Sequence, residues 1–437
     1  MDQVALLALP DEVLLAVLAH LSPRELLGCR VQCRRLRDLC LHRRLWTAAC
    51  VSDLGVLRAA LSLAPCLRQV TVRASDLEAV ACLVQGSACV VTMLRLDVLS
   101  PSDAALATII VNKLSSVGGV RNLCLNIGCP SASPTLPTLL KAILCIQGIE
   151  ELTVNHGHRV PLPAPWCEVP VRPSLTKLAL SSRAGGPFMH QLLSTHAATL
   201  QDVSIPRLAE AEVPTALLGE LPQLRRLACR ATQSLSELAD HPSLAQIQLF
   251  GGDVAFPDGA RALLRRAPHL RALEFHGASG ISSAADLREL AGSRSAPLLE
   301  SLIGVGGAPE VLEQLAPLLP RFSSLQCLNL ASAPPNLLRA ISPESLPSLS
   351  TLSLTCPDQG TCLHAWLHDP AIQDLLLRNP RLHLLHCGLL DVPQGCACVW
   401  CRWGCHARLR SGWLYSAHPG ACPRNCFQVA GPSRSSP

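Results

Sequence analysis

Long apolar runs are missing from this sequence, and so are most aromatic side chains. No uncharged apolar stretch reaches the roughly 18–20 residues that a membrane-spanning helix needs, so we expect no membrane partner. Aromatic residues make up only 3% of the 437 residues, although apolar residues make up 49%. A core must therefore be built mainly from Leu, Val, Ala and Cys, which suits thin repeated layers better than one large globule.

A strong charge of either sign is also missing. The net charge is +5 with 16% charged residues, so neither nucleic acid nor an anionic membrane surface is an expected partner. The first twelve residues lack a basic leader, and Asp11 and Glu12 interrupt their apolar stretch, so we expect no secretory signal. The protein should then be cytoplasmic or nuclear, with its 22 cysteines reduced and mostly buried. Cys124, Cys229 and Cys387 stand where a repeated core would need apolar residues.

The sequence motifs of common catalytic sites are absent as well. We find no phosphate-binding GxxxxGK, no nucleophile GxSxG and no zinc-binding HExxH. No catalytic residue is therefore expected, and the chain is interpreted as a non-enzyme.

The first fifty residues instead predict three short helices. Apolar residues recur at helical spacing from Val13 to Leu21. A second helix start is well specified, because Ser22 can cap it, Pro23 suits its first turn and Glu25 completes a capping box. A basic stretch then leads to Leu45 and Trp46. So small a unit cannot bury a good core by itself, so it should lean on a partner or on the following chain.

This segment resembles an F-box. The resemblance is carried by a Leu-Pro start, an apolar helix, a Val-x-Cys-Arg-Arg stretch and a closing Leu-Trp, with one departure at Leu36, where the family usually has Trp or Phe. It implies docking on a Skp-type adaptor, and through it on a cullin, by Leu9, Pro10, Leu14, Leu15, Leu18, Val31 and Cys33. The alternative is a helical cap that only closes the following repeats.

After residue 60 one pattern returns thirteen times, Leu-x-x-Leu-x-Leu with conservative replacements. Its copies begin at residues 67, 91, 120, 149, 175, 200, 224, 244, 270, 299, 325, 349 and 382. The spacing averages about 26 residues, within the range of leucine-rich repeats. Alternation at the end of each copy predicts a strand with one buried face, and the intervening segments predict helical or irregular returns.

The pattern therefore predicts an α/β fold, a leucine-rich-repeat solenoid with a curved parallel sheet and outer helices, preceded by the three-helix F-box. We expect an F-box over residues 1–50, about 13 repeats over 51–390, and a Cys- and Trp-rich cap with a disordered end over 391–437. The pairing of an F-box with leucine-rich repeats is itself a recognised family arrangement.

The outward residues of the strands should form the binding surface for a protein partner. One group is rich in the residue types of interface hot spots, because an aromatic side chain stands beside arginines. The candidate substrate-binding residues are Arg226, Arg230, Phe250, Glu274 and His276. The alternative is a solvated face on which a loop covers Phe250.

The tail after residue 393 concentrates cysteine, histidine and tryptophan. Cys398-x-x-Cys401 and His418-x-x-x-Cys422 approximate the ligand spacing of a structural zinc site. Three further cysteines leave the ligand set ambiguous, and the alternative is a capping segment in which Cys and Trp act as hydrophobes. No other cofactor is expected.

The F-box resemblance implies the substrate-recognition subunit of a Skp–cullin–F-box ubiquitin ligase, whose repeats capture a protein for ubiquitination and degradation. A leucine-rich-repeat scaffold that is not coupled to ubiquitin transfer is the alternative. Leu36 is the sequence feature that favours it.

Overall fold

The computed structural model divides into two compact units, Met1–Leu224 and Arg225–Pro437. It describes residues 9–386 except 131–132, 159, 164–170, 184, 209–212, 252–255, 277–282, 307 and 355–368, and in addition residues 414–416 and 427–428. Within the described residues, no helix combines the length and apolar character that a membrane crossing requires.

The first unit starts with four short helices, one more than the three expected, because the closing Leu-Trp segment forms a helical turn of its own: α1 (Asp11–Leu18), α2 (Pro23–Cys29), α3 (Arg34–Leu39) and α4 (Arg43–Trp46). Helix α2 has the expected capping box, in which the Ser22 hydroxyl accepts from the Glu25 backbone N–H and the Glu25 carboxylate accepts from that of Ser22. Leu14, Leu18 and Trp46 are buried. The indole N–H of Trp46 donates to the Cys40 carbonyl over 2.7 Å, which satisfies its polar atom inside the core.

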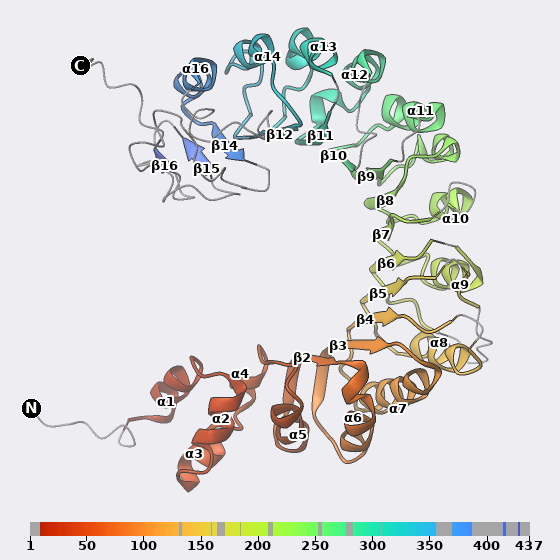
Figure 1. The fold of residues 1–437 in the computed structure, drawn as a ribbon, viewed down its shortest axis with the longest axis vertical. Coiled ribbons are helices and arrows are strands. Elements are labelled where there is room, and N and C mark those ends of the chain that lie inside the picture. Colours follow the sequence, from red (N-terminus) through yellow and green to blue (C-terminus); the bar gives the residue numbers. More distant parts are fainter. Residues whose placement is uncertain are drawn as a thin grey trace, which may run out of the picture. The chain divides into compact units, whose positions relative to one another are not determined.

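A parallel sheet fills the rest of the first unit. Its strands, each hydrogen-bonded to the next in chain order, are β1 (Cys50–Val51), β2 (Cys66–Val72), β3 (Val90–Val98), β4 (Asn122–Ile127), β5 (Glu151–His156), β6 (Lys177–Ser181) and β7 (Asp202–Ile205). The returns carry α5 (Leu54–Leu63), η2 (Ala74–Asp76), α6 (Leu77–Gln85), α7 (Pro101–Val117), α8 (Leu136–Leu144), α9 (Pro187–Thr195) and α10 (Thr215–Gly219). The helices lie on one side of the sheet and leave its other face open (Figure 1).

The second unit repeats this design. Its strands are β8 (Arg226–Arg230), β9 (Gln246–Phe250), β10 (Ala272–His276), β11 (Ser301–Val305), β12 (Cys327–Leu330), β13 (Thr351–Leu354) and β14 (His383–His386), all parallel, followed by β15 (Leu414–Ser416) and β16 (Phe427–Gln428). The described returns include η4 (Gln233–Leu238), α11 (Asp258–Arg266), α12 (Ala284–Ala291), η5 (Ala296–Leu298), α13 (Pro309–Glu313), η6 (Ala316–Arg321), α14 (Pro335–Ala340) and α16 (Pro370–Arg378). Strand β15 pairs antiparallel with β14, so the edge strand β14 has a partner.

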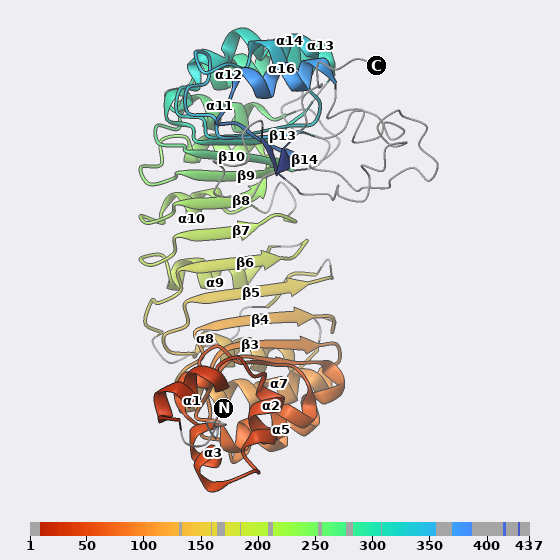
Figure 2. The same ribbon diagram turned by 90° about the vertical axis from the view of Figure 1, so that its left-hand side faces the viewer.

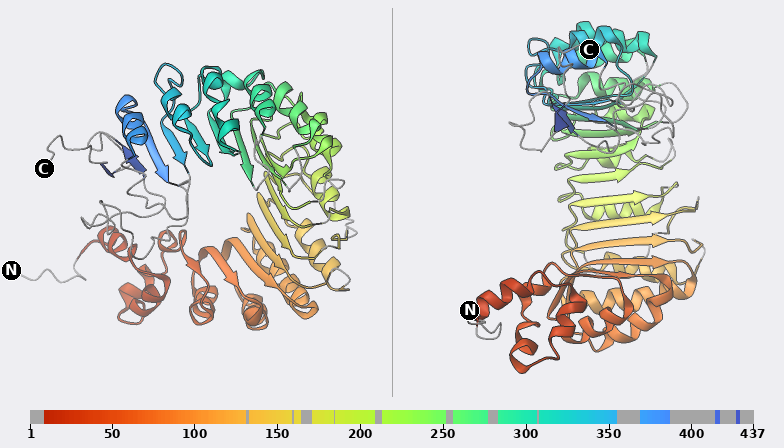
Figure 3. Two further views of the ribbon diagram at one scale, coloured as in Figure 1. Left: turned by 45° about the horizontal axis from the view of Figure 1, so that its top comes forward. Right: turned by 60° about the vertical axis from the view of Figure 1, so that its left-hand side comes forward.

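The repeated apolar positions form continuous buried rows. In the first unit the row runs in register through Leu94, Leu123, Leu152, Leu178 and Val203, all of them buried. The second unit has an equivalent row from Leu227 on β8 to Leu384 on β14. A buried Leu or Val contributes roughly 1.5–3 kcal/mol, and no single repeat could bury its side chain without a neighbour. Figures 2 and 3 show the stacked strands that carry these rows.

The expected fold class is therefore confirmed: a helical start is followed by parallel strands that alternate with helices, as in a leucine-rich-repeat solenoid. Each of the thirteen motif copies contains one strand, from β2 to β14. Cys229 is fully buried as expected, and burial raises the pKa of its thiol to about 12. The expectation for Cys124 was wrong, because its position on β4 faces the open side and is only half-buried. Cys387 lies outside the described residues.

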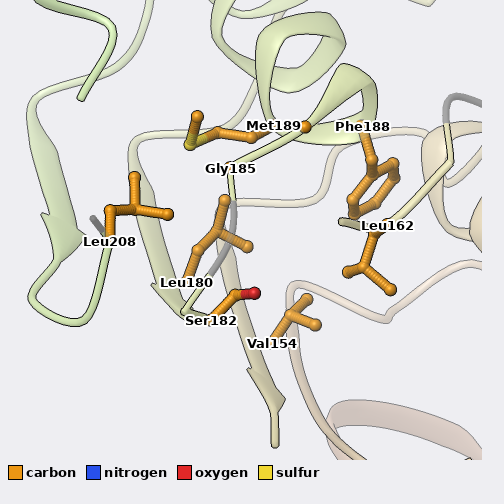
Figure 4. A pocket seen from close by; sticks show the side chains of 9 residues that line it. Val154, Leu162, Leu180, Ser182, Gly185, Phe188, Met189 and Leu208 are labelled. Carbon is orange, nitrogen blue, oxygen red and sulfur yellow. The ribbon is translucent and has the colours of Figure 1, made fainter. Parts of the chain in front are cut away.

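A small cavity remains between the sheet and helix α9 (Figure 4). It measures about 20 Å³ and is lined mostly by apolar side chains, among them Leu162, Leu180, Phe188, Met189 and Leu208. A cavity of this size has room for about one water molecule, and an apolar lining keeps such a space dry. We interpret it as a gap in the core rather than a ligand site.

His196, next to helix α9, is expected to make the first unit sensitive to acid. It is 1% exposed, and its Nδ1 accepts from the backbone N–H groups of Ser174 and Leu175 over 3.3 and 3.4 Å. Burial lowers its pKa to about 4, whereas an unfolded chain has about 6.5. Because the pKa is lower in the folded chain than in the unfolded chain, neutral His196 favours the folded state. This contribution to stability is complete above pH 6.5 and is lost as the pH falls toward 4.

We expect the free energy of unfolding to fall by about 2 kcal/mol from pH 7 to pH 5, because His196 takes up a proton more readily in the unfolded chain. Urea unfolding at both pH values measures this difference. A His196→Asn variant, whose amide can still accept but does not titrate, serves as the control and should lose less stability over the same interval. Equal losses in the two proteins would contradict the assignment.

Candidate functional site

The helical start separates its apolar residues into an inner and an outer set. Leu14 and Leu18, two of the candidate docking residues, are buried in the unit's own core. Pro10 and Val31 are exposed, and Val31 has 71% of its surface accessible. Leu9, Leu15 and Cys33 are half-buried. The surface part of this candidate site therefore centres on the start of α1 and on the turn between α2 and α3.

Two exposed residues of α1 were not among the candidates. Val13 and Val17 are 43% and 44% exposed and stand four residues apart on the helix, so they lie on one face. Their signal in the sequence was this spacing, but it is shared with Leu14 and Leu18, one residue further along. We include Val13 and Val17 in the outer apolar surface, which consists of Pro10, Val13, Val17 and Val31.

Arg35 on α3 forms hydrogen bonds with the residues at the beginning of α1. Its guanidinium donates to the Asp11 carboxylate over 2.6 Å and to the Leu9 carbonyl over 2.7 Å. Leu36, where the F-box family usually has an aromatic residue, is half-buried, and its backbone N–H donates to the Cys33 sulfur over 3.4 Å. These contacts join the segments that carry Leu9, Pro10, Val31 and Cys33.

The second candidate site lies on the open face of β8, β9 and β10, inside the second unit. Arg230, Phe250 and His276 are in register on the three neighbouring strands. The rings of Phe250 and His276 are stacked, with centroids 4.7 Å apart and planes inclined by 13°. All three residues are half-buried, so the stacked rings and the neighbouring arginine are both partly accessible.

Glu274 is tied into the same cluster. Its carboxylate accepts from the Gln248 amide over 3.0 Å and lies 3.3 Å from Nε2 of His276. Arg226 is exposed and pairs in register with Gln246, so it lies at the opposite end of these strands from Phe250. The structure therefore brings Arg230, Phe250, Glu274 and His276 together and sets Arg226 apart.

A comparison with known protein families found a match for the helical start. Residues 6–52 match the F-box-like family. The comparison with curated proteins found no match. The F-box-like domain thus covers all four helices α1 to α4, the Arg35 contacts and the outer apolar surface.

The open face is not equally exposed along the second unit. Thr351 and Ser353, outward positions of β13 by the alternation of the motif, are both buried. Phe250, four strands earlier in the second unit, is only half-buried. The open face at the β8–β10 cluster is thus better placed for contact with another molecule than the open face at β13.

The candidate zinc ligands Cys398, Cys401, His418 and Cys422 lie outside the described residues. Within the described ones, no group of three or more His, Cys, Asp or Glu side chains is placed to hold a metal ion.

Proposed function

We propose that the chain is the substrate-recognition subunit of a Skp–cullin–F-box ubiquitin ligase. The F-box-like domain would bind a Skp-type adaptor, and through it a cullin, by the outer apolar surface. The leucine-rich repeats would hold a protein for ubiquitination and degradation. The observation that carries the proposal is the match of residues 6–52 on a helical unit that exposes valines instead of burying them.

Co-purification tests this role. The tagged full chain should retain a Skp-type adaptor and a cullin in comparable amounts. A scaffold uncoupled from ubiquitin transfer remains the second candidate, favoured by Leu36 in place of an aromatic residue. Retention of neither subunit would decide for the scaffold, whereas retention of both would decide for the ligase.

The β8–β10 cluster is the proposed substrate contact. Its support is the flat Phe250–His276 stack beside Arg230, because aromatic and arginine side chains dominate interface energies. Gln248 and Glu274 add a hydrogen-bonded polar edge. Charges of both signs are present, which favours a protein surface over a purely anionic ligand.

We expect Phe250→Ala and Arg230→Ala each to reduce substrate capture about tenfold. Capture is measured by affinity purification under proteasome inhibition, with quantification of the proteins that wild type retains more strongly when the proteasome is blocked. Arg265→Ala is the control, because Arg265 is exposed on helix α11 of the same unit. Unchanged capture by both cluster variants would remove the cluster from the substrate site.

A further inference from the structure

A row of polar side chains crosses the open face of the first unit near the carboxyl ends of β3, β4 and β5. Asp97, Asn126 and Asn155 occupy matching register positions on these strands. The Asn126 amide nitrogen donates to the Asp97 carboxylate over 2.7 Å, and that of Asn155 donates to the Asn126 oxygen over 2.8 Å. Ser181 on β6 continues the register after Asn155.

The Asp97 carboxylate determines how the two asparagine amides in this row are oriented. Asp97 can only accept, so Asn126 must turn its nitrogen toward Asp97 and its oxygen toward Asn155. Each asparagine then keeps one further amide N–H. Among the described residues, neither these N–H groups nor the Asn155 oxygen has a recorded partner. An amide with a donor and an acceptor to spare matches the hydrogen-bonding groups of a peptide unit.

A hollow of about 340 Å³ opens beside this row. Asn126, Asn155, Ser181 and Arg207 supply its polar lining, and Leu99, which is 60% exposed, supplies an apolar wall. It lies at the carboxyl ends of β4, β5 and β6.

Arg207 gives the hollow its charge. It is exposed and, in the part of the chain that the structure describes, it forms no ion pair or hydrogen bond. The other titratable side chain of the lining, His156, is buried, and burial together with the neighbouring His158 lowers its pKa, so it stays neutral at pH 7. The described part of the lining thus presents one cation with several neutral donors.

We infer that this hollow binds the carboxylate of a Glu or Asp side chain in an extended segment of a partner protein. Arg207 would form the charge-assisted pair, and the spare groups of Asn126 and Asn155 would bind the adjacent main chain. The inference rests on the proposed function in that the partner is the captured protein.

A carboxylate fits this lining better than a phosphate does. A guanidinium pairs with a carboxylate through two parallel hydrogen bonds, which balance one negative charge. A phosphorylated residue carries nearly two negative charges and is usually held by a cluster of arginines. Among the described residues that line the hollow, Arg207 is the one arginine.

Peptide selection by the immobilised full chain tests the inference. One library holds ten-residue peptides with a fixed central Glu and random uncharged flanks, and matched libraries carry Gln or phosphoserine instead. Wild type should retain the Glu library about tenfold more than the Gln library, as expected for one charge-assisted pair. Equal retention of Glu and Gln would overturn the inference, and so would a tenfold preference for phosphoserine over Glu.

Two variants locate the binding. Arg207→Gln should remove the preference for Glu, and Gly157→Trp should fill the hollow, because a Cβ at Gly157 meets no atom within 4 Å. Their controls are Arg73→Gln, at an exposed arginine just after β2, and Gly86→Trp, at an equally open glycine after α6. If both hollow variants kept the preference for the Glu library, the binding would lie elsewhere. The same would follow if the control variants lost this preference equally.

Adaptor capture is measured on the same preparations. If the adaptor binds but the Glu preference is absent, the carboxylate site is refuted and the proposed ligase role stands. If the Glu preference is present and sensitive to Arg207→Gln while the adaptor is not retained, the site stands and the ligase role falls.

Discussion

Replacing Val31 with aspartate is expected to weaken capture of the Skp-type adaptor by about a hundredfold. Val31 is 71% exposed and lies in the turn after helix α2, so the change should leave the folded chain intact. In the complex, a charge would lie inside an apolar contact without a partner. Losing a central apolar contact and burying such a charge together cost on the order of 3 kcal/mol, which corresponds to a factor of about a hundred.

The measurement is adaptor binding by purified chain, with circular dichroism to verify folding. Leu377→Asp provides the matched control, since Leu377 is also an exposed apolar residue but lies on helix α16 in the second unit. It should bind the adaptor as wild type does. If Val31→Asp retained wild-type affinity, the outer apolar surface would not be the docking surface.

Leu14 and Leu18 would be poor probes of the same contact. Both are buried, and replacing a buried leucine by alanine costs about 2–5 kcal/mol of folding stability. Loss of adaptor binding in such a variant would therefore report on unfolding as much as on contact. Val13→Asp and Val17→Asp are better probes, because both residues are exposed rather than buried in the core, at 43% and 44%.

The fold could be predicted because its signal repeats. Each copy of the motif alternates apolar and polar positions, and the buried positions Leu123, Leu152 and Leu178 fall in register on consecutive strands. A single hexamer of this kind occurs by chance in a leucine-rich chain, but the recurrence of thirteen does not. Cys124 was misplaced because a cysteine can be read as apolar at either face of a strand, and the alternation of β4 puts it outside.

The helical start could be recognised but not oriented from its sequence. In α1, Val13 and Val17 form one stripe at helical spacing, and Leu14 and Leu18 form another. Both stripes are apolar, so periodicity alone cannot say which one faces the core. The packing of α1 against α3, where Arg35 binds Asp11 and the Leu9 carbonyl, decides the question.

The β8–β10 cluster was predicted in composition but not in geometry. The register of equal motif positions brings Arg230, Phe250 and His276 together, which the alternation of the strands anticipates. The stacking of the two rings and the contacts of Glu274 depend on side-chain rotamers, about which a sequence pattern carries no information. Alternation along β3, β4 and β5 likewise places Asp97, Asn126 and Asn155 on the outward face, but it carries no information about the hydrogen bonds between them.

Gly259→Ala is expected to destabilise the second unit strongly, by about 3 kcal/mol or more. Gly259 lies in the first turn of α11, where its backbone N–H donates to the Gln233 side chain over 3.0 Å. A Cβ at this position would overlap the Gln233 carbonyl and lie 2.7 Å from its Cα. Because the obstacle is the backbone of η4, a side-chain rotation cannot relieve it, and the two helices must separate.

Urea unfolding followed by circular dichroism measures the loss. Gly86→Ala is the control, because Gly86 is a glycine at the end of helix α6 where a Cβ meets no atom within 4 Å, so its unfolding midpoint should stay near that of wild type. A wild-type midpoint for Gly259→Ala would mean that α11 and η4 do not touch as described. Because the β9–α11 return follows the strand that carries Phe250, separation of these helices should also weaken substrate capture while adaptor binding by the first unit persists.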